Sequence, residues 1–294
     1  MTTLSSRPGT GNAAGSADAT NHAWRLPIFI VNLDRAPERL SLMQQAFGEK
    51  GLTFTRVPAV DGRLLSEDER NQWCPRPGRF WKLGPGEIGC FLSHRRCWEL
   101  IAEGTADYAA IFEDDVILAD DAKTFLQDWS WVSPDADIVK LDTYCHRTTI
   151  SKTTIKLTGR YALARLRATH VSGAGYLVSR RAAVKLLALS SQFADPLDHF
   201  LFNPISILFS SLAVCQLIPA ICIQRDLLRL GTMPSALLSD LGADRGRPPA
   251  SPLHHILARK LTQPVKKLFR LANRLRMRFF GPDISVHIPF ADRT

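Results

Sequence analysis

Three consecutive carboxylates follow an apolar run in Ile111–Leu118, which reads IFEDDVIL. Burying an unpaired carboxylate is costly, so acids in a core strand need a partner or a function. Successive side chains of a strand point to opposite faces, which places Glu113 and Asp115 on one face and Asp114 on the other. At the end of a parallel strand, two carboxylates on one face can hold Mn²⁺ or Mg²⁺ against a diphosphate. Two structural interpretations stay open, namely helix capping and a satisfied buried network.

Strands that alternate with helices must position these acids. The run LPIFIVNL predicts a buried strand, and a helix follows from about Pro37 and ends near Gly48 or Gly51. Further strands are expected over 54–60, 108–118, 136–144 and 170–179, helices over 90–104, 121–129 and 180–190, and a loop over 84–89. A mixture of helix and strand is expected over 206–224. This alternation indicates an α/β fold, with a mostly parallel, Rossmann-like sheet and helices on both faces.

The chain divides by composition into four parts. Residues 1–24 are expected to be a flexible leader, 25–230 the catalytic domain, 231–254 a Gly- and Pro-containing linker, and 255–294 a basic tail. The leader has no apolar core typical of a secretory signal. The sequence contains no run of eighteen apolar residues, so no membrane-spanning helix is predicted. The six cysteines show no CxxC spacing, which favours free thiols in a reducing compartment over zinc.

The net charge of +9 comes mainly from one segment. Between Arg259 and Arg278 there are eight basic residues and no acid, which leaves +1 for the rest of the chain and argues against nucleic-acid binding by the whole domain. At about 100° per residue, six apolar side chains of this segment fall on one helical face and most of the basic ones on the other. The apolar residues are Val265, Leu268, Phe269, Ala272, Leu275 and Phe279. Such a helix suits an anionic membrane surface, and packing on its own domain is the alternative.

Five motifs occur in a fixed order along the chain: VNLDRAPERL, AVDGR, GEIGCFLSH, AIFEDDVIL and GAGYLVSRRAA. Together they resemble the glycosyltransferase family 25 domain of lipopolysaccharide and lipo-oligosaccharide glycosyltransferases, a group that the collagen galactosyltransferases also resemble. The resemblance runs from about Ile28 to Arg225. It implies an A-type glycosyltransferase fold, a nucleotide-sugar donor and a Mn²⁺-assisted transfer with inversion.

The resemblance also implies roles for the acids. Asp115 would be the direct metal ligand, Glu113 would bind the ribose or a metal-bound water, and Asp114 would support the loop from the other face. A metal there would stabilise the charge of the departing nucleoside diphosphate without proton transfer.

Donor contacts are expected on the neighbouring loops. Asn32 and Asp34 can bind a uracil or ribose, while Arg35 and Arg39 can approach phosphate. The other residues assigned to the donor are Asp61, Gly62, Glu87, Gly89, Ser93 and His94, the last four near a helix N-terminus that suits phosphate. Structural readings are open for three of these sites: a solvated Arg39, a plain turn at Asp61-Gly62 and a core histidine at His94.

Inversion needs a base that takes the proton of the acceptor hydroxyl. Asp198 in FADPLDHF is the favoured residue, with Asp195 and Asp142 as other candidates and helix capping as the structural alternative. This segment matches the family only loosely. On the acceptor side the expected residues are Gly173, Gly175 and Tyr176, which could instead form a packed bend.

The leading hypothesis is therefore a cytoplasmic enzyme, peripheral on the inner membrane, that moves galactose or glucose from a UDP-sugar to a lipopolysaccharide, lipo-oligosaccharide or other surface-glycan acceptor with Mn²⁺ or Mg²⁺. A metal-dependent nucleotide phosphotransferase or hydrolase is one alternative, although the chain lacks a GxxxxGK[ST] loop. A non-catalytic nucleotide-sugar-binding protein is another, and the intact acidic motif argues against it.

Overall fold

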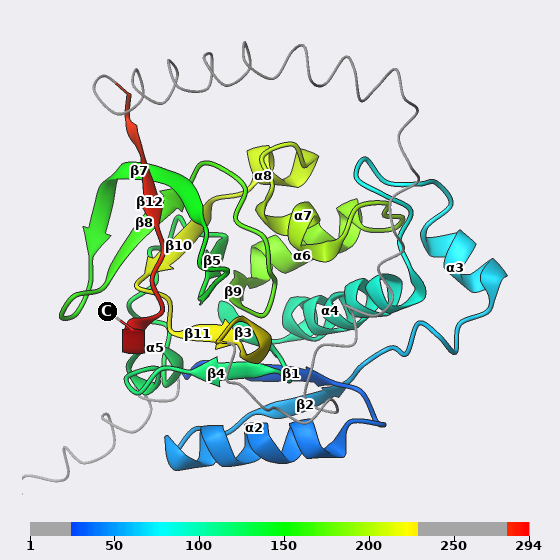
Figure 1. Ribbon diagram of the computed structural model, residues 1–294, viewed down its shortest axis with the longest axis horizontal. Coiled ribbons are helices and arrows are strands. Elements are labelled where there is room, and N and C mark those ends of the chain that lie inside the picture. Colours follow the sequence, from blue (N-terminus) through cyan, green and yellow to red (C-terminus); the bar gives the residue numbers. More distant parts are fainter. Residues whose placement is uncertain (1–24, 229–280, 294) are drawn as a thin grey trace, which may run out of the picture.

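A mixed nine-stranded sheet forms the centre of the molecule, whose computed structural model describes residues 25–228 and 281–293 (Figure 1). The strand order is β12-β7-β8-β10-β5-β9-β3-β1-β2. The strands are β1 (Ile28–Asn32), β2 (Thr55–Pro58), β3 (Tyr108–Glu113), β5 (Ile138–Lys140), β7 (Arg147–Lys156), β8 (Ala162–Leu166), β9 (Gly175–Ser179), β10 (Val214–Ile218) and β12 (Asp283–His287). β1 pairs in parallel with β2 and β3, and β5 with β10, whereas the other pairs are antiparallel.

A second, three-stranded sheet joins segments from distant parts of the chain. It consists of β4 (Val116–Leu118), β11 (Cys222–Gln224) and β6 (Asp142–Thr143), in the order β4-β11-β6. The helices are α2 (Pro37–Glu49), α3 (Glu67–Trp73), α4 (Pro85–Glu103), α5 (Lys123–Leu126), α6 (Arg180–Leu189), α7 (Leu197–Phe202) and α8 (Ile207–Ser211), with 3-10 helices η1 (Arg225–Leu228) and η3 (Ala291–Arg293).

Strand alternation builds a core on each face of the large sheet. On one face Ile30 and Phe112 pack with Phe47 of α2, whose ring meets that of Phe112 edge-on at 5.7 Å. On the other face Val31 and Ile111 belong to a second core, which α4, α6 and α7 cover. Figure 1 shows α2 on one side of β1 and β2 and α4 on the other. The α/β class with helices on both faces is thus confirmed, but the sheet is mixed rather than mostly parallel, because five of its eight strand pairs are antiparallel. The parallel pairs β2-β1 and β1-β3 lie where the acidic motif emerges.

Several predicted boundaries are wrong. IFEDDVIL is not one strand: β3 ends at Glu113, the chain turns, and β4 leaves the large sheet to pair with β11. Likewise 136–144 splits into β5 and β6, and the helix expected over 121–129 is only α5. The expected loop at 84–89 is mostly the first turn of α4, since Pro85 suits the first helical position and Glu87 accepts a hydrogen bond from the Gly84 N–H at 3.0 Å.

The C-terminal residues belong to the same sheet as the acidic motif, although they were assigned to a separate tail over 255–294. β12 pairs with β7 along its whole length, and Ile288 and Phe290 beyond it are buried. The helix α3 and the hairpin β7–β8 were not predicted. The amphipathic segment 265–279, the leader 1–24 and the linker 231–254 lie outside the described residues. Among the described helices, none combines the length and the apolar character needed to cross a membrane.

Candidate active site

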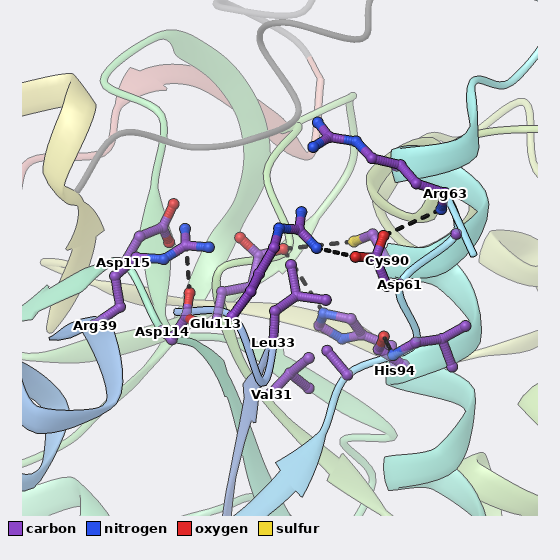
Figure 2. Close-up of a pocket in the computed structure, with 16 residues that line it drawn as sticks. Val31, Leu33, Arg39, Asp61, Arg63, Cys90, His94, Glu113, Asp114 and Asp115 are labelled. Carbon is purple, nitrogen blue, oxygen red and sulfur yellow. Dashed lines mark hydrogen bonds and ion pairs between the residues drawn. The ribbon is translucent and has the colours of Figure 1, made fainter. Parts of the chain in front are cut away.

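A cavity opens where β1, β2 and β3 end, against the first turns of α4 (Figure 2). Its wall includes Val31 and Leu33 from β1 and the residue after it, Val60 beyond β2, and the three acids Glu113, Asp114 and Asp115. The carboxyl ends of parallel strands are the usual ligand site of an α/β sheet, because the connecting loops diverge there. We refer to this space as the first cavity.

Asp114 points toward β1 and α2, away from the other two acids. Its Oδ2 accepts a 2.6 Å hydrogen bond from Asn32 Nδ2, and its Oδ1 lies 3.4 Å from the Arg39 guanidinium. Asn32 is itself buried, and its amide also contacts the Ala36 carbonyl and Arg56. Burial raises the pKa of Asp114 although Arg39 opposes the shift. Asn32 and Arg39 therefore support the acidic turn, and Arg39, 7% exposed, is not a solvated helix residue.

Glu113 and Asp115 are brought together by a residue far along the chain. Gln224 Nε2 donates to Glu113 Oε2 at 3.0 Å and reaches Asp115 Oδ2 at 3.5 Å. The turn after β3 thus leaves Glu113 and Asp115 on one side and Asp114 on the other, the grouping that the sequence predicted, although a turn rather than strand alternation produces it. Asp115 Oδ1 is buried and has no hydrogen-bond partner among the described residues. Burial, followed by repulsion from Glu113 and Asp114, raises the pKa of Asp115 well above its usual value.

This arrangement fits a hard divalent cation. Mn²⁺ and Mg²⁺ prefer carboxylate oxygens, and the unpartnered Asp115 oxygen is a buried acceptor beside a second carboxylate. The residues that would hold the ion are Asp115 and Glu113, the two that the sequence predicted.

His94 lies on α4 beneath Glu113, within a chain of buried polar groups. Trp98 Nε1 donates to the Tyr176 hydroxyl at 2.9 Å, and that hydroxyl lies 2.9 Å from His94 Nδ1. The tautomer that satisfies all three groups has Tyr176 donating to Nδ1, so that Nε2 carries the proton. Nε2 lies 3.7 Å from Glu113 Oε1. Burial by itself raises the pKa of Glu113, but the nearby His94 ring and hydrogen bonds from Cys90 and Gln224 outweigh it and the pKa is lowered.

Ligand atoms of Cys90, His94 and Glu113 lie within 4.8 Å of one another, a set that could suggest a softer metal. Two features disfavour it. Burial and the charge of Glu113 raise the pKa of the Cys90 thiol well above its usual value, and the tautomer described above leaves a proton on His94 Nε2. His94 is better suited to donate a hydrogen bond toward the acids or an anionic ligand.

The loop after β2 is held against α4 by close backbone contact. A Cβ on Gly62 would lie 1.8 Å from the Pro85 carbonyl oxygen, and one on Gly89 would lie 2.5 Å from that of Val60. Ser93 joins the same two segments: its hydroxyl donates to the Gly89 carbonyl at 2.6 Å and accepts from the Val60 N–H at 2.8 Å. Gly62 and Ser93 thus shape the wall of the first cavity.

The rim of the first cavity carries charged residues from two loops. Arg35 forms an ion pair with Asp61, and the Asp61 carboxylate also accepts from the Arg63 N–H at 3.1 Å (Figure 2). The structure therefore places Arg35 and Asp61 at this site. Asp34 does not line it: this carboxylate is 82% exposed and pairs with Arg56.

A second cavity adjoins the first and shares Cys90 and Glu113 with it. Asp198, on the first turn of α7, lines this space. Its carboxylate accepts from the Ser172 N–H at 3.2 Å and from the His199 N–H at 2.8 Å, and it does not cap the helix. Glu87 faces this second cavity rather than the first.

The other two candidates for the base are occupied elsewhere. Asp142 is fully buried and forms an ion pair with Lys140, and Asp195 accepts from the Arg79 N–H at 2.9 Å. Neither lines the second cavity. Of the three aspartates, Asp198 is the one that lines the second cavity.

The acceptor residues expected from the sequence separate in the structure. Gly173 lines the second cavity. Gly175 is a packing position, because a Cβ there would lie 2.5 Å from Cys222 Sγ. Tyr176 was expected to offer its face to a sugar, and this prediction is wrong: the side chain is fully buried, with its hydroxyl held by His94 and Trp98.

Sequence reasoning missed several residues that line these cavities or join their acids, among them Trp81, His199, Gln224 and Arg63. Gln224 had a signal, since it is a polar residue at the end of the apolar run AICIQ. His199 follows the favoured Asp198 directly. Arg63 stands in the motif AVDGR but was given no role of its own, and Trp81 lies in a segment without regular periodicity.

Comparison with known proteins gives a consistent result. Residues 25–201 match the model of glycosyltransferase family 25, described as an LPS biosynthesis protein. The lacto-N-neotetraose biosynthesis glycosyltransferase LgtB of Neisseria meningitidis is 32% identical over 254 residues, which cover 80% of this chain and 90% of that protein. The lipooligosaccharide biosynthesis protein lex-1 of Haemophilus influenzae is 31% identical over 202 residues, 65% of this chain and 66% of that one.

A solved structure is also similar. It is a glycosyltransferase involved in the glycosylation of the major capsid of PBCV-1, with a TM-score of 0.38 and 11% identity over 70% of this chain and 94% of that one.

Proposed function

The chain belongs to glycosyltransferase family 25, and from this premise we propose that it moves galactose or glucose from a UDP-sugar to a lipopolysaccharide or lipo-oligosaccharide acceptor, with inversion. The observation that carries the proposal is the junction of the two cavities at Glu113, with the acids on one side and Asp198 on the other. A donor in the first cavity and an acceptor in the second would meet there.

The donor side of the proposal follows from the charges around the first cavity. Arg35, Arg39 and Arg63 supply positive charge beside it, and His94 Nε2 supplies a buried donor directed at the acids. These groups suit a diphosphate, which needs several hydrogen-bond donors in a site of low dielectric constant. A divalent cation held by Asp115 and Glu113 would supply further stabilisation of the leaving diphosphate.

The acceptor side assigns the proton transfer to Asp198. Its carboxylate takes the proton of the acceptor hydroxyl while that oxygen forms a bond to the anomeric carbon. The bond from that carbon to the diphosphate oxygen breaks, and the electron pair leaves with UDP. The Ser172 and His199 N–H groups hold the carboxylate in place for this step.

The test is acceptor-dependent release of UDP by the purified full chain. Each UDP-hexose is offered with Mn²⁺, with and without a lipo-oligosaccharide or its soluble glycan. We expect UDP release that requires the glycan, and a glycan product heavier by one hexose. Release of inorganic phosphate without a glycan would instead indicate a nucleotide hydrolase, and donor binding without turnover a non-catalytic protein.

Two substitutions assign the roles. Asp198→Asn should lower kcat roughly 10²–10⁴-fold, the usual contribution of a general base. Asp115→Asn should lower activity by a similar factor and weaken the dependence on Mn²⁺. Asp195→Asn is the matched control, because Asp195 contacts the 78–79 loop and not the second cavity, and it should keep most of the activity. Equal losses in Asp195→Asn and Asp198→Asn would contradict the assignment.

We also propose that the enzyme acts on the cytoplasmic face of the inner membrane. The support is compositional: the segment 259–278 carries eight basic residues, no acid and an apolar periodicity. The full chain should float with vesicles that contain anionic lipid and not with neutral ones. Replacing Lys266, Lys267 and Arg270 with Gln should reduce the fraction of protein that floats with the anionic vesicles. Unchanged flotation would reject the proposal.

A further inference from the structure

We propose that Trp81 is a stacking platform for a pyranose ring of the acceptor. The inference rests on the proposed function in taking the second cavity as the acceptor site. In this proposal the second cavity binds a glycan terminus rather than an acyl chain, and Trp81 is the residue that selects it.

Trp81 stands in the larger of the two cavities. The water-accessible space there is about 310 Å³, against about 90 Å³ in the first cavity. Trp81 is half-buried and shares the wall with Asp198 and His199. A ring bound on Trp81 would therefore lie within the same space as the proposed base, and Glu113 connects that space to the donor side.

The Trp81 ring is held in place before any ligand binds. Its Nε1 donates to both oxygens of Glu87, at 2.9 and 3.1 Å, and Glu87 is 7% exposed and also accepts from the Gly84 N–H. The ring meets His199 edge-on, with centroids 5.9 Å apart and planes at 89°, and Phe80 packs against His199 at 3.9 Å. A fixed aromatic ring loses little conformational entropy on binding, which favours affinity.

These contacts also decide which part of the indole a ligand can use. The N–H is already bonded to Glu87, so the ring offers an apolar face and no hydrogen bond. A pyranose ring has an apolar face of C–H groups and a rim of hydroxyls. The C–H face can pack against the face of an aromatic ring. Asp198, His199 and Gln224 in the same cavity can bind the hydroxyls. An acyl chain could not use the hydrogen-bonding capacity that these groups have left and would desolvate them at a cost in free energy.

The test uses the full-length protein and three substitutions of the platform. Trp81→Ala should raise the KM for the glycan acceptor about tenfold, which corresponds to a loss of about 1.4 kcal/mol of binding free energy. The KM for the UDP-sugar should stay within about twofold of the wild-type value. Trp81→Phe keeps an aromatic face and should give a smaller rise. Glu87→Gln keeps an acceptor for Trp81 Nε1 but holds the ring less firmly. Its KM for the glycan acceptor should lie between those of wild type and Trp81→Ala.

Trp131→Phe is the matched control. The indole of Trp131 is also bonded through Nε1, to the Phe125 carbonyl at 3.0 Å, but it packs with the core on the opposite face of the sheet. Both KM values should stay unchanged in this variant. Equal changes in both KM values in Trp81→Phe, or no change in that variant and in Trp81→Ala, would overturn the proposal.

A binding measurement without donor separates this inference from the proposed function. Titration of a methyl hexopyranoside or of lactose should change the tryptophan fluorescence of wild type and of Trp131→Phe, and should not do so in Trp81→Phe. If no donor gives turnover but this difference is seen, the pyranose site stands and the transferase proposal fails. If turnover is seen but the fluorescence response of Trp81→Phe equals that of wild type, the stacking role is wrong.

Discussion

Asp114 and Asp115 are neighbours in the sequence, yet their charges are compensated in different ways. Asp114 has Asn32 and Arg39 as partners, so its burial is offset within the protein. Asp115 keeps a buried oxygen that receives no hydrogen bond from residues 25–228 and 281–293, and it is repelled by Glu113 and Asp114. A buried carboxylate in that state is costly unless a cation or ligand compensates it, which is the pattern of a functional site.

His170 gives a prediction about stability and pH. It is 2% exposed with Nδ1 3.0 Å from Gln216 Oε1, and burial, aided by Lys140, lowers its pKa from 6.5 to about 3. Between these values the unfolded chain binds a proton that the folded protein excludes, so the free energy of unfolding falls as the pH falls from 6.5 toward 3. At pH 4 this contribution reaches about 3 kcal/mol. Urea unfolding of wild type and His170→Asn from pH 7.5 to 4 should show a shallower decline in the variant.

The exposed His287 provides the control for that experiment. His287→Asn should change the pH dependence much less than His170→Asn, because His287 lies at the surface and its charge contributes least among the causes of the lowered pKa of His170. Parallel curves for wild type and His170→Asn would contradict the prediction.

The first cavity depends on how closely one loop approaches one helix. Gly62, after β2, and Gly89, in α4, each lack the space for a Cβ, and Ser93 joins the same backbone segments. The motifs AVDGR and GEIGCFLSH are thus two halves of one contact. Their glycines are required by close packing, which explains why a plain turn at Asp61-Gly62 accounts for only part of the pattern.

Gly62→Ala tests this contact. The new Cβ would lie 1.8 Å from the Pro85 carbonyl oxygen, so the backbone must move, at a cost of about 1–3 kcal/mol. We expect a lower midpoint of thermal unfolding and a higher KM for the donor, since Gly62 lines the first cavity. Gly48→Ala in α2 has nothing within 4 Å of its Cβ and should be neutral or stabilise by about 0.5–1 kcal/mol. A Gly62→Ala protein as stable as wild type would show that the loop can move freely.

The fold as a whole is completed by residues that come more than fifty positions after η1. β12 forms the edge of the large sheet, the Thr143 hydroxyl donates to the Ile288 carbonyl at 2.7 Å, and Asp292 accepts from the Asp120 N–H. Thr143 belongs to β6, which pairs with β11 beside the Gln224 contact. The C-terminal strand is therefore connected to the acidic site through the small sheet.

Phe290→Ala measures this contribution. Phe290 is buried in the same core as Phe112, and its truncation should lower the free energy of unfolding by about 3–5 kcal/mol. His287→Ala, at an exposed position on β12, should change it by no more than about 0.5 kcal/mol. Denaturant unfolding compares the two. Similar values for both variants would mean that the C-terminal residues add little to the core.

Local patterns were enough to predict part of this protein. The pattern of the motif grouped Glu113 with Asp115 apart from Asp114, although a turn after β3 and not a continuous strand produces that grouping. Apolar periodicity with Pro37 identified β1 and α2, because both depend on backbone geometry within a few residues. Asp198 was chosen through the family resemblance, from its spacing after the Gly-rich strand, and in the structure it lines the second cavity.

Only the tertiary structure decided which distant groups meet. Gln224 reaches Glu113 because β4 and β11 pair, and Trp81 is fixed by Glu87 because the start of α4 brings them together. Tyr176 looked like a sugar-binding aromatic residue and is instead a buried hydrogen-bond partner of His94. Residue type and spacing limit what a side chain can do locally, whereas sheet order and helix packing determine its partners and its exposure.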